Sequence, residues 1–256
     1  MIRGLYTSAS GMMAQYQKMD VITNNLANIN TTGYKKDQVI TASFAEELTK
    51  RLNDTPNGGF MPKTQNIGRM SLGVQVDEIY TNFVQGSLQE THQPLDLALH
   101  GQGFFTVLAQ EGNDWVERYT RDGAFLLDPE GRMVTTEGHR VVGQQGEIIL
   151  PEGEITINEK GEIFVEGDYV DQVQLVSFDD LSTLQKIGDN LLQAEGSEPQ
   201  PFQGKVLQGF LESSNVNPVR EMVEMITALR VYEASQKALQ AQDQTLEKII
   251  NEAGRV

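Results

Sequence analysis

The first 30 residues of the chain read MIRGLYTSAS GMMAQYQKMD VITNNLANIN and carry a seven-residue repeat of apolar side chains. Leu5, Met12, Met19 and Leu26 recur at that interval. Side chains spaced in this way lie on one face of an α-helix, so the repeat predicts an amphipathic helix with a narrow apolar seam. At about 1.5 Å per residue, about 25 residues would form a rod of about 37 Å.

The other end of the chain has the same period, from about residue 218 to about residue 251. Four residues repeat there by seven: Met225, Tyr232, Leu239 and Leu246. Asn217 is suited to cap this helix with its side-chain oxygen, and Pro218 fits the first helical position, which needs no amide donor. Two such seams are typical both of a hairpin packed on its own domain and of a coiled coil with other molecules. We predict that the two long terminal helices pair as a coiled coil.

The middle of the chain has short alternating runs and frequent glycine. Runs such as 73–79 and 172–178 predict strands, and Asp128-Pro129-Glu130-Gly131 predicts a turn. Residues 53–70, with two prolines and no clear period, predict a flexible loop or connector. The expected fold class is therefore α+β, with a mainly β central domain and a discontinuous helical domain made by the two ends.

These patterns divide the chain into four expected parts. They are an N-terminal axial helix with an Asn-rich exit (1–35), a connector with extended segments (36–90), an acidic β domain (91–212) and a C-terminal axial helix (213–256).

Negative charge is concentrated in the middle of the chain. The sequence has 36 acidic and 20 basic side chains, a formal net charge of −16. Residues 96–211 hold 21 of the acidic and seven of the basic ones, whereas residues 1–40 have a net charge of +2 and residues 212–256 one of −2. Packing of copies through the two ends therefore meets little electrostatic opposition. The acidic balance also argues against a nucleic-acid binder, which needs clustered Lys and Arg.

Other classes of protein are excluded by what the sequence lacks. No apolar run approaches the roughly 18 to 20 residues that cross a bilayer, so we expect no membrane insertion. The first ten residues lack the basic start and apolar stretch of a cleavable signal peptide. With no cysteine, disulfides, thiolate zinc sites and cysteine nucleophiles are ruled out.

The sequence contains few of the motifs that indicate an enzyme. Its three histidines form no HExxH pattern, and there is no nucleophile-elbow sequence. Asp96, Asp122, Asp128 and Glu130 are candidates for an acid–base pair of a wall-cleaving hydrolase. Carboxylates this abundant need no catalytic explanation, because most face water. We expect no catalysis, no cofactor and no metal.

Several separate strings resemble the flagellar axial proteins of bacteria, in particular the rod and hook group of the basal body. They are Gly4–Met12, the Asn-rich run 24–35, Leu95–Phe105, Tyr119–Phe125 and Gly209–Asn217, in the order expected for that family. The residues that carry the resemblance at the two helix boundaries are Asn24, Asn25, Asn28, Asn30, Gly33, Asn215 and Asn217.

The resemblance implies a structural subunit of the basal-body rod, the drive shaft that transmits torque to the hook. Members of this family polymerise through their terminal helices into a helical tube with β domains outside. The implied partners are further copies of the chain, neighbouring rod and hook subunits, and the flagellar type III export apparatus. The implied location is extracytoplasmic, in the periplasm or cell wall, reached without a cleaved signal peptide.

Two points stay open at this stage. A secreted oligomeric adhesin or a wall-associated hydrolase is the alternative function. Tyr34, Lys35 and Lys36 are candidates for contact with a neighbouring subunit, although a basic pair at a helix exit is usually solvated.

Overall fold

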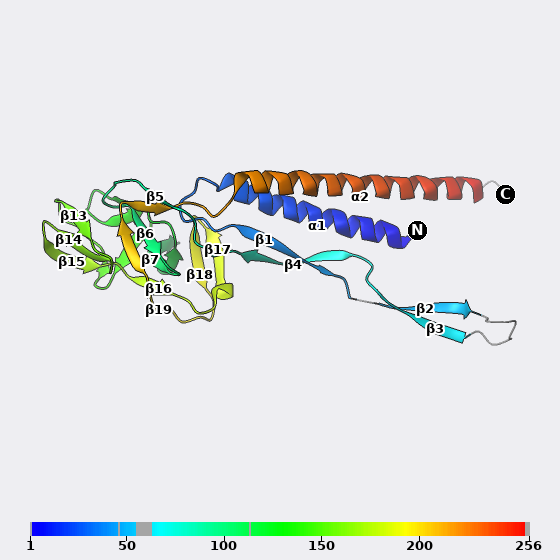
Figure 1. Ribbon diagram of the computed structural model, residues 1–256, viewed down its shortest axis with the longest axis horizontal. Helices are drawn as coiled ribbons and strands as arrows, with labels where there is room; N and C mark the ends of the chain where they lie inside the picture. Colours follow the sequence, from blue (N-terminus) through cyan, green and yellow to red (C-terminus); the bar gives the residue numbers. More distant parts are fainter. Residues whose placement is uncertain (1, 46, 55–62, 113, 254–256) are drawn as a thin grey trace. The chain divides into compact units, whose positions relative to one another are not determined.

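A computed structural model describes residues 2–45, 47–54, 63–112 and 114–253 of the chain (Figure 1). The chain divides into two compact units. Unit 1 comprises residues 1–24, 37–80 and 219–256, and unit 2 comprises residues 25–36 and 81–218.

Unit 1 contains most of the two terminal helices. They are α1 (Ile2–Ala27) and α2 (Pro218–Ala253), the second beginning at the predicted proline. Glu221 places a carboxylate in the first turn of α2, where it is stabilised by the positive end of the helix dipole.

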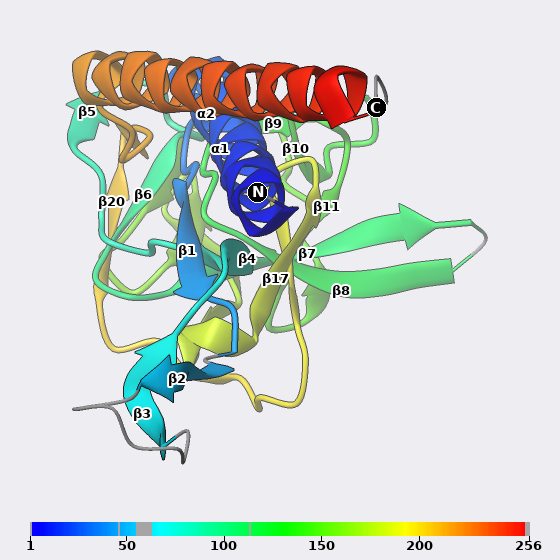
Figure 2. The ribbon, with the colours of Figure 1, turned by 90° about the vertical axis from the view of Figure 1, so that its right-hand side faces the viewer.

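The predicted coiled-coil pairing of these helices is wrong. Figures 1 and 2 show α1 running alongside α2, and an apolar groove of about 520 Å³ lies between them. Knobs-into-holes packing needs apolar knobs on both facing stripes. Gly4 and Gly11 of α1 face Gln242 and Ser235 of α2, so these positions supply no such knobs. The eight predicted seam residues are all half-buried rather than enclosed.

Unit 1 also contains two antiparallel ribbons. Strand β1 (Asp37–Ser43) pairs with β4 (Val74–Thr81), and β2 (Glu47–Asp54) pairs with β3 (Lys63–Met70). Strand β3 therefore occupies much of the segment 53–70 that the sequence predicts as a loop, and residues 55–62 of that segment lie outside the described residues.

Unit 2 is built on a ten-stranded sheet, and the structure is mainly β. Seven strands follow the order β17-β18-β8-β7-β11-β10-β9, with β12, β16 and β19 attached. In chain order these are β7 (Phe104–Glu111), β8 (Asp114–Thr120), β9 (Phe125–Leu127), β10 (Met133–Thr135), β11 (Arg140–Gly143), β12 (Gly146–Glu147), β16 (Leu175–Ser177), β17 (Leu184–Gly188), β18 (Leu191–Ala194) and β19 (Gln200–Pro201). A short 3₁₀ helix, η1 (Leu181–Thr183), precedes β17.

Smaller sheets complete unit 2. One has three antiparallel strands, β13 (Ile155–Ile157), β14 (Glu162–Val165) and β15 (Asp168–Gln172). Two are pairs: β6 (Leu97–His100) with β20 (Lys205–Gln208), and β5 (Leu88–Glu90) with β21 (Phe210–Glu212). The last pair positions Glu212, the residue at which β21 ends.

The core of unit 2 is aromatic and aliphatic. Phe105 and Phe125 are fully enclosed and meet edge to face, with ring centroids 5.0 Å apart. A second cluster forms around Phe104, Phe178 and Leu184. These clusters form the apolar interior of the β domain.

Candidate functional site

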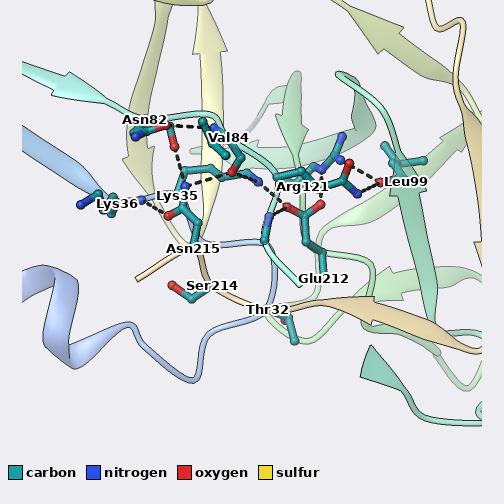
Figure 3. Close-up of polar contacts among 12 residues, drawn as sticks. Thr32, Lys35, Lys36, Asn82, Val84, Leu99, Arg121, Glu212, Ser214 and Asn215 are labelled. Atoms are coloured by element: carbon teal, nitrogen blue, oxygen red, sulfur yellow. Dashed lines mark hydrogen bonds and ion pairs between the residues drawn. The ribbon is translucent and has the colours of Figure 1, made fainter. Parts of the chain in front are cut away.

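Glu212 is the centre of a buried polar cluster in unit 2, which we call the junction (Figure 3). Its side chain is 2% exposed. One carboxylate oxygen accepts hydrogen bonds from the Lys35 ammonium and from the backbone N–H of Gly86, the latter at 2.8 Å. The other oxygen accepts from Arg121 Nε at 2.7 Å. A buried carboxylate is thus paired with two cations, which offsets the cost of removing it from water.

Arg121 extends the junction to β6 and to the loop that follows it. Its terminal nitrogens donate to three backbone carbonyls, those of Leu99 at 2.8 Å, Gly101 at 2.7 Å and Gly103. The planar guanidinium matches this fan of acceptors, which a lysine would not. Arg121 therefore joins β21, through Glu212, to the end of β6 and the loop that follows it.

Lys35 ties the chain segment that leaves α1 to the same point. Besides Glu212, its ammonium donates to the Val84 carbonyl at 3.1 Å. Burial removes water from the ammonium and lowers the pKa of Lys35, while the attraction of Glu212 opposes that shift.

Residues 28–36, which follow α1, are called the exit segment. Gly33 allows this segment to approach the backbone of Arg121 closely. Its φ is +66°, and its amide donates to the Glu212 carbonyl at 2.7 Å. A Cβ at this position would lie 2.5 Å from the carbonyl carbon of Arg121. The backbone therefore requires a glycine here for both conformation and space.

Asn215 joins three segments that are far apart in sequence. Its Oδ1 accepts from the Lys36 amide at 2.8 Å, and its Nδ2 donates to the carbonyls of Asn82 at 2.7 Å and Val84 at 3.0 Å. Figure 3 shows these partners on both sides of the amide. The segments before α2, after α1 and after β4 are thus fastened to one another.

Asp122 forms a second contact to the exit segment. Its Oδ1 accepts from Thr32 Oγ1 at 2.5 Å and from the Ala124 amide at 3.1 Å. Burial raises the pKa of Asp122, and the hydrogen bond from Thr32 opposes that shift.

The seven predicted motif residues differ in their burial and in their hydrogen-bond partners. Gly33 and Asn215 lie in the junction, and Asn25 is buried beside it, accepting from the Tyr34 hydroxyl at 3.2 Å. Asn28 accepts from Thr31 Oγ1 at 3.2 Å in the turn after α1. The remaining three, Asn24, Asn30 and Asn217, are exposed.

The sequence reasoning missed the junction itself. Of the three candidates for contact with a neighbouring subunit, Tyr34 and Lys35 are only 6% and 5% exposed, and Lys36 is half-buried. Arg121 and Glu212 stand inside the strings that carry the family resemblance, and that position was the available signal.

The predicted assembly residues lie on the helices. Those of α1 are Leu5, Met12, Met19 and Leu26, and those of α2 are Met225, Tyr232, Leu239 and Leu246; Met12, Tyr232 and Leu239 line the apolar groove. Their role in assembly stays a prediction.

Within the described ranges no helix has the length and apolar character of a membrane span. No group of three or more His, Cys, Asp or Glu side chains in those ranges is arranged to hold a metal.

Three family models match the chain in the order of its parts. "Flagella basal body rod protein" matches residues 5–35, "Flagellar hook protein FlgE/F/G D1 domain" matches 98–165, and "Flagellar basal body rod FlgEFG protein C-terminal" matches 207–252. The first and third cover much of the terminal helices, and the second covers much of the sheet of unit 2.

Full-length relatives agree with these matches. The flagellar basal-body rod protein FlgG of Agrobacterium fabrum is 36% identical, covering 95% of this chain and 96% of its own. FlgG of Borreliella burgdorferi is 36% identical over 96% of this chain and 97% of its own. FlgF of Caulobacter vibrioides is 34% identical over the whole of both chains. The resemblance inferred from the sequence is confirmed, and the chain belongs to the family of bacterial flagellar basal-body rod proteins.

Proposed function

We propose that this rod protein polymerises through its terminal helices into the tubular drive shaft that transmits torque from the motor to the hook. Its relatives and family models support a structural subunit of the basal-body rod that assembles with neighbouring rod and hook subunits. They give no support to the adhesin or hydrolase alternatives.

One observation carries the proposal: the helices of unit 1 keep large apolar side chains in water. Val219 is 66% exposed, Val223 58% and Met13 69%. Exposed apolar patches that are rimmed by polar groups mark interaction sites. The same segments carry little net charge, so copies can approach one another through them.

The junction supplies the mechanical part of the proposal. The segments on either side of the junction are covalent links between the β domain and the helices, and we infer that they carry load when torque passes between these parts. Lys35, Glu212 and Asn215 fasten those segments to unit 2 by charged and neutral hydrogen bonds. Buried and fully partnered polar groups resist local opening, because each broken bond leaves a desolvated group.

Further parts of the proposal rest on family membership. The protein acts outside the cytoplasm, is exported by the flagellar type III apparatus without a cleaved signal peptide, and has no catalytic role. Its work is the repetition of one packing arrangement along a helical tube.

The test is mass spectrometry of purified hook–basal bodies, paired with electron microscopy of cells that lack the gene. We expect the protein in the complex and truncated shafts without hooks in the mutant. Normal flagella in the mutant, with the protein absent from the complex, would overturn the proposal.

A further inference from the structure

The groove between α1 and α2 has apolar walls and one acidic end. Met12, Met13 and Tyr16 of α1 line one wall, and Tyr232 and Leu239 of α2 line the other. Met13 and Tyr16 are 69% and 57% exposed. Asp20 stands at the end of the groove that lies farthest along α1.

The first turns of α2 carry an apolar ridge on a different face. It consists of Val219, Met222, Val223 and Ile226, which are 66%, 46%, 58% and 52% exposed. On a helix of 3.6 residues per turn these four lie opposite the enclosed Ala228. Their i, i+3, i+4, i+7 spacing is that of a helix which enters a hydrophobic groove.

The ridge and the groove match in length and in charge. The ridge runs from Val219 to the exposed Arg230, and the groove runs along α1 from Ala9 to Asp20. Each spans about 16 Å at the helical rise of about 1.5 Å per residue. A ridge laid parallel to α1 places the positive Arg230 beside the negative Asp20.

We propose that the α2 ridge of one copy lies in the α1–α2 groove of the next copy, parallel to α1, with Arg230 beside Asp20. This inference rests on the proposed function and names the contact through which copies join. The ridge cannot enter the groove of its own chain, because the same helix, α2, already forms one wall of that groove. Since every chain carries both complementary surfaces, the occupant is a second copy. Such a contact is heterologous and leaves a groove at one end of the array and a ridge at the other, so it extends as an open helical array when the rotation between copies does not close a ring.

Cross-linking tests the contact directly, since the chain has no native cysteine. Cells would express two single-cysteine variants together, Met13→Cys and Ile226→Cys, the second with a tag. Treatment of purified hook–basal bodies with a short bis-maleimide reagent should join the two variants, at twice the mass of the chain. The control pairs Met13→Cys with Gln244→Cys, an exposed position on α2 outside the ridge and the groove.

The outcomes separate the contact from the function. If both variants are built into rods but cross-link no more than the control pair, the contact is wrong while the rod function stands. If the unmodified chain is missing from hook–basal bodies, the proposed function fails as well.

Charge exchange provides a second test that does not depend on the cysteine variants. Asp20→Arg and Arg230→Asp should each reduce incorporation into rods by about tenfold or more, because each places like charges together. The double variant should restore incorporation. Losses that simply combine in the double variant would overturn the contact.

Discussion

The junction of unit 2 and the helical pair of unit 1 differ in the burial of their side chains: polar groups are enclosed and paired in the junction, whereas apolar groups are exposed on the helices. In the junction, Lys35, Arg121 and Glu212 are each no more than 6% exposed and bonded to one another or to backbone carbonyls. In the helical pair, Val219 remains 66% exposed on α2, and Met13 remains 69% exposed at an open groove.

The difference separates contacts that one chain completes from surfaces that, under the proposed function, a second copy covers. Buried charges are costly unless they are paired, so the junction has to be closed before the subunit is stable. An exposed apolar face is tolerated in a monomer and gains free energy only when a partner covers it. The expected effects on the free energy of unfolding therefore decrease from the junction to the groove.

The largest effect is expected for Glu212→Ala. The substitution leaves the ammonium of Lys35 and the guanidinium of Arg121 buried without their counter-charge. Removing one partner of a buried ion pair typically costs about 3–5 kcal/mol. Thermal or denaturant unfolding of the purified chain measures the loss, with the exposed Glu198→Ala as the control. A loss no larger than that of Glu198→Ala would mean that the junction does not stabilise unit 2.

Gly33→Ala should have the next largest effect. The φ of +66° disfavours alanine by about 1–2 kcal/mol, and the added Cβ meets the Arg121 backbone at 2.5 Å. Gly112→Ala is a matched control, because Gly112 has the same φ of +66° but nothing within 4 Å of the added atom. The unfolding free energy should fall by more in Gly33→Ala than in Gly112→Ala, and the excess measures the close approach. Equal losses would show that the exit segment can move away from Arg121.

Asp122 gives the junction a smaller, pH-dependent effect. Because burial raises its pKa above 3.8 in the folded state, the folded protein holds this proton more tightly than the unfolded chain does. Its contribution to stability therefore falls as pH rises from the ordinary value through the raised one. Asp122→Asn cannot titrate, so the wild-type chain should gain stability relative to the variant as pH is lowered through that window. Denaturant unfolding of both proteins across acidic pH measures the difference, and parallel curves would contradict the shift.

The sequence predicts the local features of both regions well. A seven-residue repeat indicates which face of a helix is apolar, and in α2 the residues Met225, Tyr232, Leu239 and Leu246 all lie on its half-buried side. Pro218 marks the start of that helix correctly. Alternation and turn residues likewise predict the β domain, because these signals act over a few neighbouring residues.

Contacts between distant segments could not be predicted in this way. Lys35 and Glu212 are 177 positions apart, and no periodicity relates them. The coiled-coil prediction failed for a related reason. A repeat identifies the inward face of a helix but not the distance to its neighbour, and at Gly4, Gly11, Ser235 and Gln242 the facing stripes lack apolar knobs.

The smallest effect on unfolding, and the sharpest contrast with Glu212→Ala, is expected for Met12→Asp. Met12 lines the open groove and is half-buried, so the new carboxylate can reach water in the monomer and unit 2 should unfold as in the wild type. In an assembled rod the same carboxylate would be covered by apolar side chains, where an unpaired charge is costly. Incorporation into hook–basal bodies, measured by mass spectrometry, should therefore be lost while the unfolding transition is kept. Gln244→Asp, an exposed change outside the groove, should leave both unaltered. Rods that accept Met12→Asp as readily as Gln244→Asp would mean that the groove stays open to water after assembly, and the contrast between a closed junction and an assembling groove would not hold.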